Sequence, residues 1–252
     1  MTTGARRNPE RMSAWILAGI AATEGAWVAI NFAHSPSGFL KYAGFAAGEV
    51  GTFAGWALAA IVVGLFVWFS ARLPSVRANL LRPSFLKALG LAVAVAAGFL
   101  EEIIFRKWLM DYLSHEEMGP VLQVLASGLA FGLAHGVWGL MGRSLRAAIG
   151  ATVVTGALGT ALAIVYIASG RSVAPCIAAH FLINALVEPG LVLAATRGEM
   201  GRVDLDPEGP IGAVTKILIG TASWTDKSLI SSGRFYPREI SKPWSVATDQ
   251  GF

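Results

Sequence analysis

Six stretches of apolar side chains follow one another between residues 13 and 196. They cover residues 13–33, 50–69, 88–109, 121–141, 147–169 and 173–196, and each is close to the roughly 20 residues that a helix needs to cross a bilayer. Residues 50–69, 121–141 and 147–169 carry no charged side chain at all. The pattern predicts an all-α fold, a polytopic membrane bundle of about six transmembrane helices.

The composition agrees with a membrane protein. Hydrophobic residues make up 54% of the chain and charged residues 14%, against about 25% charged residues in a typical soluble domain. These values exclude a disordered chain, a coiled coil and an ordinary soluble enzyme. The single cysteine, Cys176, excludes an internal disulfide and a cysteine-rich metal cluster.

The net charge of +4 raises nucleic acid as a partner, but the placement of the basic residues indicates membrane topology instead. Lysine and arginine gather before the first span and in every second connection. The positive-inside rule then places both termini in the cytoplasm, and we expect a bacterial-type plasma membrane around the chain. The bilayer is therefore an expected partner and nucleic acid is not. The basic residues on the predicted cytoplasmic side are Arg6, Arg7, Arg11, Arg72, Arg77, Arg82, Lys87, Arg143, Arg146 and Arg197.

The third span contains charges that are costly in lipid. Each charge at the bilayer centre costs about 2.5–3.5 kcal/mol, so the span either contains paired charges or lies partly in the interface. Glu102 and Arg106 are four residues apart and can pair on one face of a helix. Glu101 lies about 100° further round the helix, where Ala97 and Gly98 allow another helix to approach. One carboxylate is therefore free for chemistry.

The fourth span contains one ionisable group, His135. The turn signal Gly119-Pro120 follows Met118, which is midway in sequence between Glu101 and His135. A hairpin at this turn places the glutamate and the histidine at equal depth.

The sixth span adds His180 and Asn184, which share one helix face. A lone intramembrane histidine is often only a packing residue, but two histidines, an asparagine and a free carboxylate indicate a functional site. His135 and His180 lie at depths that differ by about 10 Å at 1.5 Å per residue. We expect tilt, or a kink near Pro175, to absorb this difference.

Three motifs now stand in order on the third, fourth and sixth apolar segments: EExxxR from Glu101, FxxxH from Phe131 and HxxxN from His180. In this order they resemble the CPBP family of CAAX-protease and bacteriocin-processing (Abi) intramembrane proteases, over about residues 80–190. The resemblance implies a peptide-bond hydrolase within the membrane. It also implies that Glu102 and Arg106 orient the site.

The resemblance implies further catalytic roles. Glu101 would be the base that activates water, and His135 would hold that water or a metal. His180 and Asn184 would polarise the carbonyl or stabilise the oxyanion. Amide hydrolysis needs such a base and such donors. Glu101, His135 and His180 also form the donor set of a catalytic zinc site, so a divalent metal such as zinc is one option and a metal-free mechanism is the other.

The expected function is therefore endopeptidase cleavage of a membrane-associated substrate, such as a CAAX-type C-terminus or a bacteriocin leader peptide. Two alternatives remain open. The polar cluster could serve a non-catalytic membrane scaffold or immunity protein, or it could carry protons in a small transporter.

The composition changes after residue 199. We assign residues 1–199 to the intramembrane protease domain and residues 200–252 to a linker and a short, non-globular tail. Residues 214–237 resemble the start of the domain-of-unknown-function family 72, which has a barrel-like fold. About 50 residues cannot close a barrel, so we expect a truncated fragment of a soluble domain.

Overall fold

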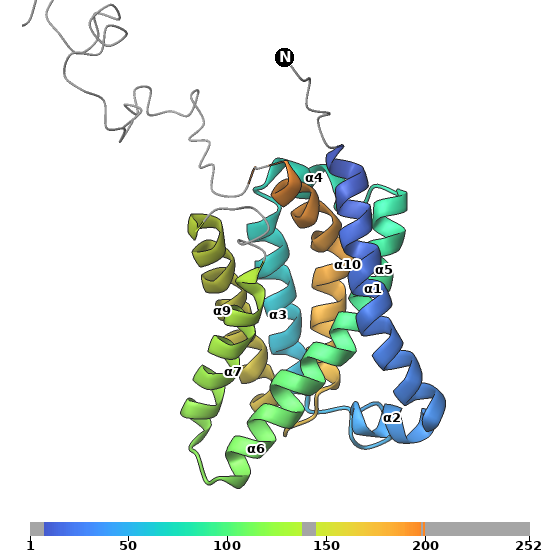
Figure 1. Ribbon diagram of the computed structural model, residues 1–252. Coiled ribbons are helices and arrows are strands. Elements are labelled where there is room, and N and C mark those ends of the chain that lie inside the picture. The colour runs from blue at the N-terminus through green and yellow to red at the C-terminus, as the bar shows by residue number, and fades with distance from the viewer. Residues whose placement is uncertain (1–7, 138–144, 198, 200–252) are drawn as a thin grey trace, which may run out of the picture. The chain divides into compact units, whose positions relative to one another are not determined.

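The computed structural model describes residues 8–137, 145–197 and 199, and within these ranges the chain forms helices and no strand (Figure 1). The first helix begins at Pro9, directly after Asn8, whose side-chain oxygen accepts hydrogen bonds from the backbone of Glu10 and Arg11. The predicted all-α class is thus confirmed. The assignments made for residues 200–252 lie outside the described residues.

Five helical segments are long and apolar enough to cross a membrane, namely residues 9–34, 53–70, 85–115, 148–168 and 174–196. A sixth apolar helix, α7, is shorter than the expected span of residues 121–141 and ends at His135. The chain is therefore an integral membrane protein. The described helices are α1 (Pro9–His34), α2 (Pro36–Tyr42), α3 (Phe53–Ser70), α4 (Pro74–Asn79), α5 (Phe85–Glu102), η1 (Ile103–Trp108), α6 (Leu109–His115), α7 (Pro120–His135), α9 (Leu145–Ala168) and α10 (Ala174–Thr196).

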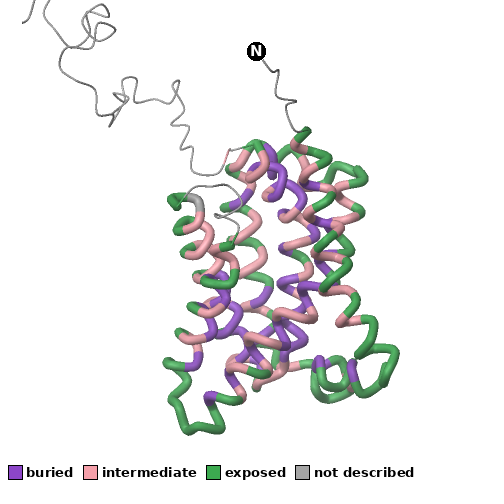
Figure 2. The backbone as a smooth tube through the Cα atoms, viewed as in Figure 1, coloured by how far each residue is buried: buried purple, intermediate pink, exposed green. Residues whose placement is uncertain are grey.

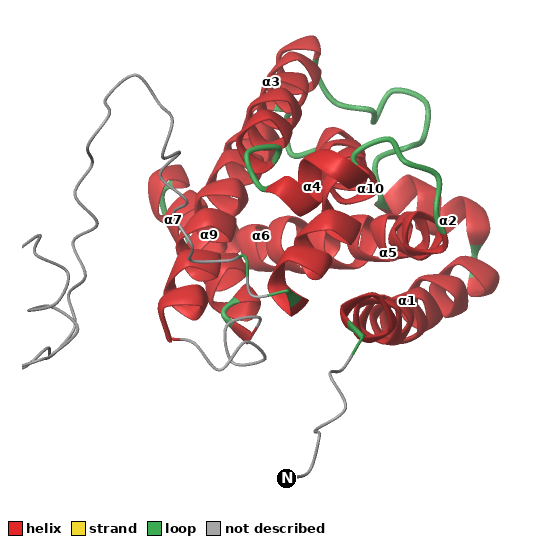
Figure 3. Cartoon of the chain, turned by 90° about the horizontal axis from the view of Figure 1, so that it is seen from above, coloured by secondary structure: helices red, strands yellow, loops and turns green. Residues whose placement is uncertain are grey.

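Helix α10 occupies the middle of the bundle. It packs against α5, α3, α4 and α1, and most of its buried residues are small or β-branched (Figure 2). Seen from above, the short helix α4 lies across the end of α10 (Figure 3). Outward-facing side chains such as Trp15 and Phe53 are 80% and 89% exposed, as expected for side chains that face lipid.

Helices α6 and α7 form the predicted hairpin. Pro120 is the first residue of α7, and Glu117 turns the chain with a φ of 58°. Helix α7 then packs closely on α9 through its glycines. A Cβ atom on Gly132 would lie only 2.5 Å from the backbone oxygen of Thr152.

A π-helical segment, η1, separates α5 from α6 and directly follows the two glutamates. Within it the backbone N–H of Leu109 bonds to the carbonyl of Ile104, five residues earlier, instead of four. Such insertions are rare and occur often at functional sites. Nothing in the sequence analysis indicated this segment.

Candidate active site

Glu101 lies at the meeting point of three helices. Its Oε2 atom is 3.6 Å from Nε2 of His135 on α7 and 3.9 Å from Nε2 of His180 on α10. The Glu101 side chain is 17% exposed, and its Oε2 atom has no hydrogen-bond partner among the described residues. The hairpin and the central helix thus bring the three groups together, as the sequence predicted.

The expected kink near Pro175 is not how the depth difference is absorbed. Pro175 lies in the first turn of α10, a position where proline fits a straight helix, and the proline within the helix is Pro189. In Figure 1 the connection from α6 to α7 extends further down than the start of α10. Residues at different distances from their helix starts therefore reach the same level.

His180 is held by a carboxylate. Its Nδ1 atom donates a hydrogen bond of 2.7 Å to Oε1 of Glu102, and both side chains are almost fully buried. Because this nitrogen carries the proton, the neutral ring has its lone pair on Nε2, which faces Glu101. A carboxylate behind a histidine fixes both the tautomer and the ring orientation.

Glu102 is in turn neutralised by Arg106. The Nε atom of Arg106 lies 3.0 Å from Oε2 of Glu102, both side chains have no exposed surface, and the contact is an ion pair without hydrogen-bond geometry. A second guanidinium nitrogen donates to the carbonyl of Gly159 on α9 at 3.0 Å. The predicted pairing four residues apart is confirmed, and Glu101 is left as the unpaired carboxylate.

Phe131 supports both imidazole rings. It stacks on His135 at a centroid distance of 4.4 Å and meets His180 edge-on at 5.8 Å. Its own carbonyl accepts a 2.9 Å hydrogen bond from Nδ1 of His135. A carbonyl can only accept, so the neutral His135 ring also presents an unprotonated Nε2 to Glu101.

Three hydrogen-bond acceptors therefore converge: one carboxylate oxygen and two imidazole nitrogens. Acceptors gathered in a poorly solvated interior repel one another unless a donor or a cation lies between them. A water molecule can donate to two of the three, and a divalent metal can accept lone pairs from all three.

The donor set fits zinc chemically, because two histidines and a carboxylate form a common catalytic zinc set. Glu102 and the Phe131 carbonyl also supply the outer hydrogen bonds that such ligands use. Within the described part of the chain, however, no group of three His, Cys, Asp or Glu side chains stands at the positions of a formed metal site.

Asn184 lies one helical turn beyond His180 and is partly exposed. Among the described residues its side chain makes no hydrogen bond, so the contacts above connect the other five predicted site residues and leave this one outside. Cys176 is fully buried and donates to the Leu162 carbonyl.

Two further carboxylates belong to the surroundings of the site, and no motif in the sequence gives either of them a role. Glu24 of α1 and Glu188 of α10 both interact electrostatically with Glu101 and His180. Their Oε2 atoms are shielded from solvent and have no partner in the described ranges. Glu188 follows Asn184 by four residues, and this spacing was the one available signal.

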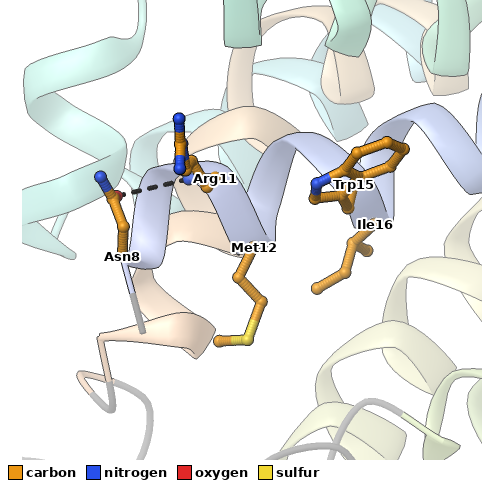
Figure 4. A pocket seen from close by; sticks show the side chains of 5 residues that line it. All are labelled: Asn8, Arg11, Met12, Trp15 and Ile16. Atoms are coloured by element: carbon orange, nitrogen blue, oxygen red, sulfur yellow. Dashed lines mark hydrogen bonds between the residues drawn. The ribbon is translucent and has the colours of Figure 1, made fainter. Parts of the chain in front are cut away.

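A hollow on the surface lies elsewhere, at the start of α1, and contains none of the motif residues (Figure 4). Only residues of this end of the chain line it, so it is separate from the site around Glu101. They are Asn8, Arg11, Met12, Trp15 and Ile16.

Comparison with family models gives a match over residues 83–186, to the family described as type II CAAX prenyl endopeptidase, Rce1-like. The matched region contains all three motifs, from Glu101 to Asn184. The match confirms the predicted resemblance to the CPBP family over this region. No curated protein and no solved structure matches the chain.

Proposed function

We propose, on the premise that residues 83–186 are the core of an Rce1-like CAAX protease of the CPBP family, that the chain is an intramembrane endopeptidase. The observation that carries the proposal is the convergence of the Glu101 carboxylate with Nε2 of His135 and of His180, at 3.6 and 3.9 Å. The family supplies the reaction class, and this geometry supplies a site for one water molecule.

Glu101 acts as the general base. A water molecule placed between Glu101 and the Nε2 atom of His135 donates one hydrogen to each. Glu101 takes the first proton as the water oxygen attacks the carbonyl carbon of the scissile peptide bond. The limited exposure of the site strengthens these interactions, because few competing water molecules surround them.

The oxygen of the former carbonyl becomes negatively charged. The Asn184 side-chain amide supplies a neutral N–H donor for this oxyanion, and His180 donates only when its second nitrogen is protonated. Glu101 then passes its proton to the leaving nitrogen, the C–N bond breaks, and a carboxylic acid and an amine result. Glu102 and Arg106 keep His180 in the required orientation.

A metal gives the other version of this mechanism. Glu101, His135 and His180 would hold it, and a bound zinc ion would polarise the carbonyl and lower the pKa of a bound water. The roles of Glu102, Arg106 and Phe131 in orienting the two imidazoles are the same in both versions.

The substrate is a peptide anchored at the membrane, of the CAAX type, the bacteriocin-leader type or a similar one. In this proposal the chain spans a bacterial-type plasma membrane and both of its termini are cytoplasmic. The basic residues before the first span and after the sixth support this orientation through the positive-inside rule.

The test is cleavage of prenylated CAAX-type peptides and of leader peptides by the purified protein in proteoliposomes. Glu101→Gln keeps the size of the side chain but removes the base, so kcat should fall by about 10²–10⁴-fold. Glu116→Gln, an exposed residue of the α6–α7 turn, is the matched control. Equal activity of the Glu101 variant and the control would refute the proposal and favour a scaffold role.

A proton-coupled transporter is the second candidate, because Glu24 and Glu188 add two shielded carboxylates around Glu101. Buried carboxylates in a membrane commonly carry protons. Proton flux into vesicles that depends on a small substrate and continues without peptide cleavage would favour this candidate.

A further inference from the structure

Pro189 lies inside α10 and removes a hydrogen bond from this helix. A proline has no N–H, so the carbonyl four residues earlier, that of Ala185, loses its usual donor. In a membrane such an unpaired carbonyl costs several kcal/mol unless another group satisfies it. The break lies nine residues after His180, on the helix that carries part of the site.

Lys87 of α5 supplies the missing donor. Its Nζ atom donates to the Ala185 carbonyl at 2.8 Å and to the Leu186 carbonyl at 3.0 Å. These are the two carbonyls that a proline at position 189 disturbs most, four and three residues before it. The lysine, on a neighbouring helix, therefore supplies the hydrogen bonds that these two carbonyls of α10 would otherwise lack.

The same face of α5 makes room for the proline ring. Gly90, three residues after Lys87, is buried against Pro189, and a Cβ atom at this glycine would collide with the ring. Gly190 is pressed in the same way against the backbone of Val76 on α4. The part of α10 around Pro189 is thus held from two sides, and Lys87 provides a polar contact at this junction.

Helices α5 and α10 also carry the two halves of the site. Glu101 and Glu102 lie at the C-terminal end of α5, and His180 lies in the second turn of α10. The 2.7 Å bond between Glu102 and His180 joins the helices at the site, and the contact from Lys87, in the first turn of α5, joins them again near the middle of α10. The relative position of the two helices along their length depends on both contacts.

We propose that Lys87 is a positioning residue, which satisfies the carbonyls freed by Pro189 and so holds α10 at the depth where His180 faces Glu101. The consequence for catalysis rests on the proposed function, whereas the pairing of Lys87 with Pro189 does not. From the sequence, Lys87 was only one of the basic residues that indicated the cytoplasmic side of the membrane. The structure gives this lysine a second role, as the hydrogen-bond donor to α10.

The experiment is a double-mutant cycle in the full chain. Lys87→Met keeps the length of the side chain but removes the donor. Pro189→Ala restores an N–H that can bond to the Ala185 carbonyl, so the lysine is no longer needed. Lys87→Arg tests rescue by another donor, and Lys41→Met, at an exposed lysine, is the matched control for loss of a positive charge.

Two measurements do not require activity. The first is the denaturation midpoint in detergent, which Lys87→Met should lower in the wild-type background and at most half as much in the Pro189→Ala background. The second is the distance between spin labels at Leu91 of α5 and Leu182 of α10, both exposed. Lys87→Met should shift or broaden this distance, and the double variant should restore it.

The third measurement is turnover. Lys87→Met should lower kcat at least about tenfold with little change in KM, because a displacement of 1 Å can cost about a hundredfold. Lys87→Arg should recover most of the loss, and Lys41→Met should have no effect. Equal losses of stability with and without Pro189 would overturn the pairing. An unchanged distance and an unchanged kcat would overturn the positioning role. Absence of turnover in the wild type would contradict the proposed function and leave the first two measurements decisive.

Discussion

Arg106→Met should destabilise the bundle far more than loss of any partly exposed cation. The substitution keeps the apolar stem but removes the guanidinium that lies 3.0 Å from Glu102, in a pair with no exposed surface. It leaves a buried carboxylate without a counter-charge and the Gly159 carbonyl without its second donor. Breaking a buried pair from one side costs about 3–5 kcal/mol.

The double variant Glu102→Gln with Arg106→Met removes both charges. The glutamine oxygen can still accept the hydrogen bond from Nδ1 of His180, so no buried group is left charged and unpaired. We expect this variant to lose less than about 2 kcal/mol, because replacing a buried pair as a whole is often close to neutral.

Lys107→Met is the matched control on the next residue. Lys107 is 28% exposed and lies 3.5 Å from Asp111, which is 37% exposed, so its pair should contribute at most about 1 kcal/mol. The assay is equilibrium unfolding in mixed micelles, followed by circular dichroism. A cost below about 1 kcal/mol for Arg106→Met, or additive losses in the double variant, would show that the pair does not neutralise the site.

Two other variants test the packing and the orientation of the site. Gly132→Ala places a methyl group against the Thr152 carbonyl, so it should cost about 1–3 kcal/mol of stability in the same unfolding assay. The control is Gly150→Ala on α9, whose new methyl group meets nothing within 4 Å, so this variant should be neutral or stabilising. Equal effects of the two variants would refute close packing of α7 on α9. Glu102→Leu combined with Arg106→Met removes the acceptor that orients His180 without leaving a buried charge unpaired, so kcat for peptide cleavage should fall about 10–100-fold relative to Glu102→Gln with Arg106→Met, and equal turnover of the two double variants would argue against this role.

Much of the fold is encoded in local sequence patterns. The apolar runs predicted the helices because burial in lipid depends on composition over about 20 residues. The Glu102–Arg106 pair followed from helical spacing, and the equal depth of Glu101 and His135 followed from the turn at Gly119-Pro120. The fourth span was expected to end at residue 141; its described helix ends at His135, and residues 138–141 lie outside the described residues.

Other parts of the site depend on how the helices are rotated and placed against one another, which no single segment encodes. The hydrogen bond between His180 and Glu102 joins residues that are 78 positions apart in the sequence. The hydrogen bonds from Lys87 to the carbonyls before Pro189 join residues that are 98 and 99 positions apart. The π-helical segment lies between two α-helical stretches, and propensity does not distinguish it from them. Local patterns therefore identify which polar residues lie in apolar segments, whereas helix packing sets which of them meet, because their partners lie on distant parts of the chain.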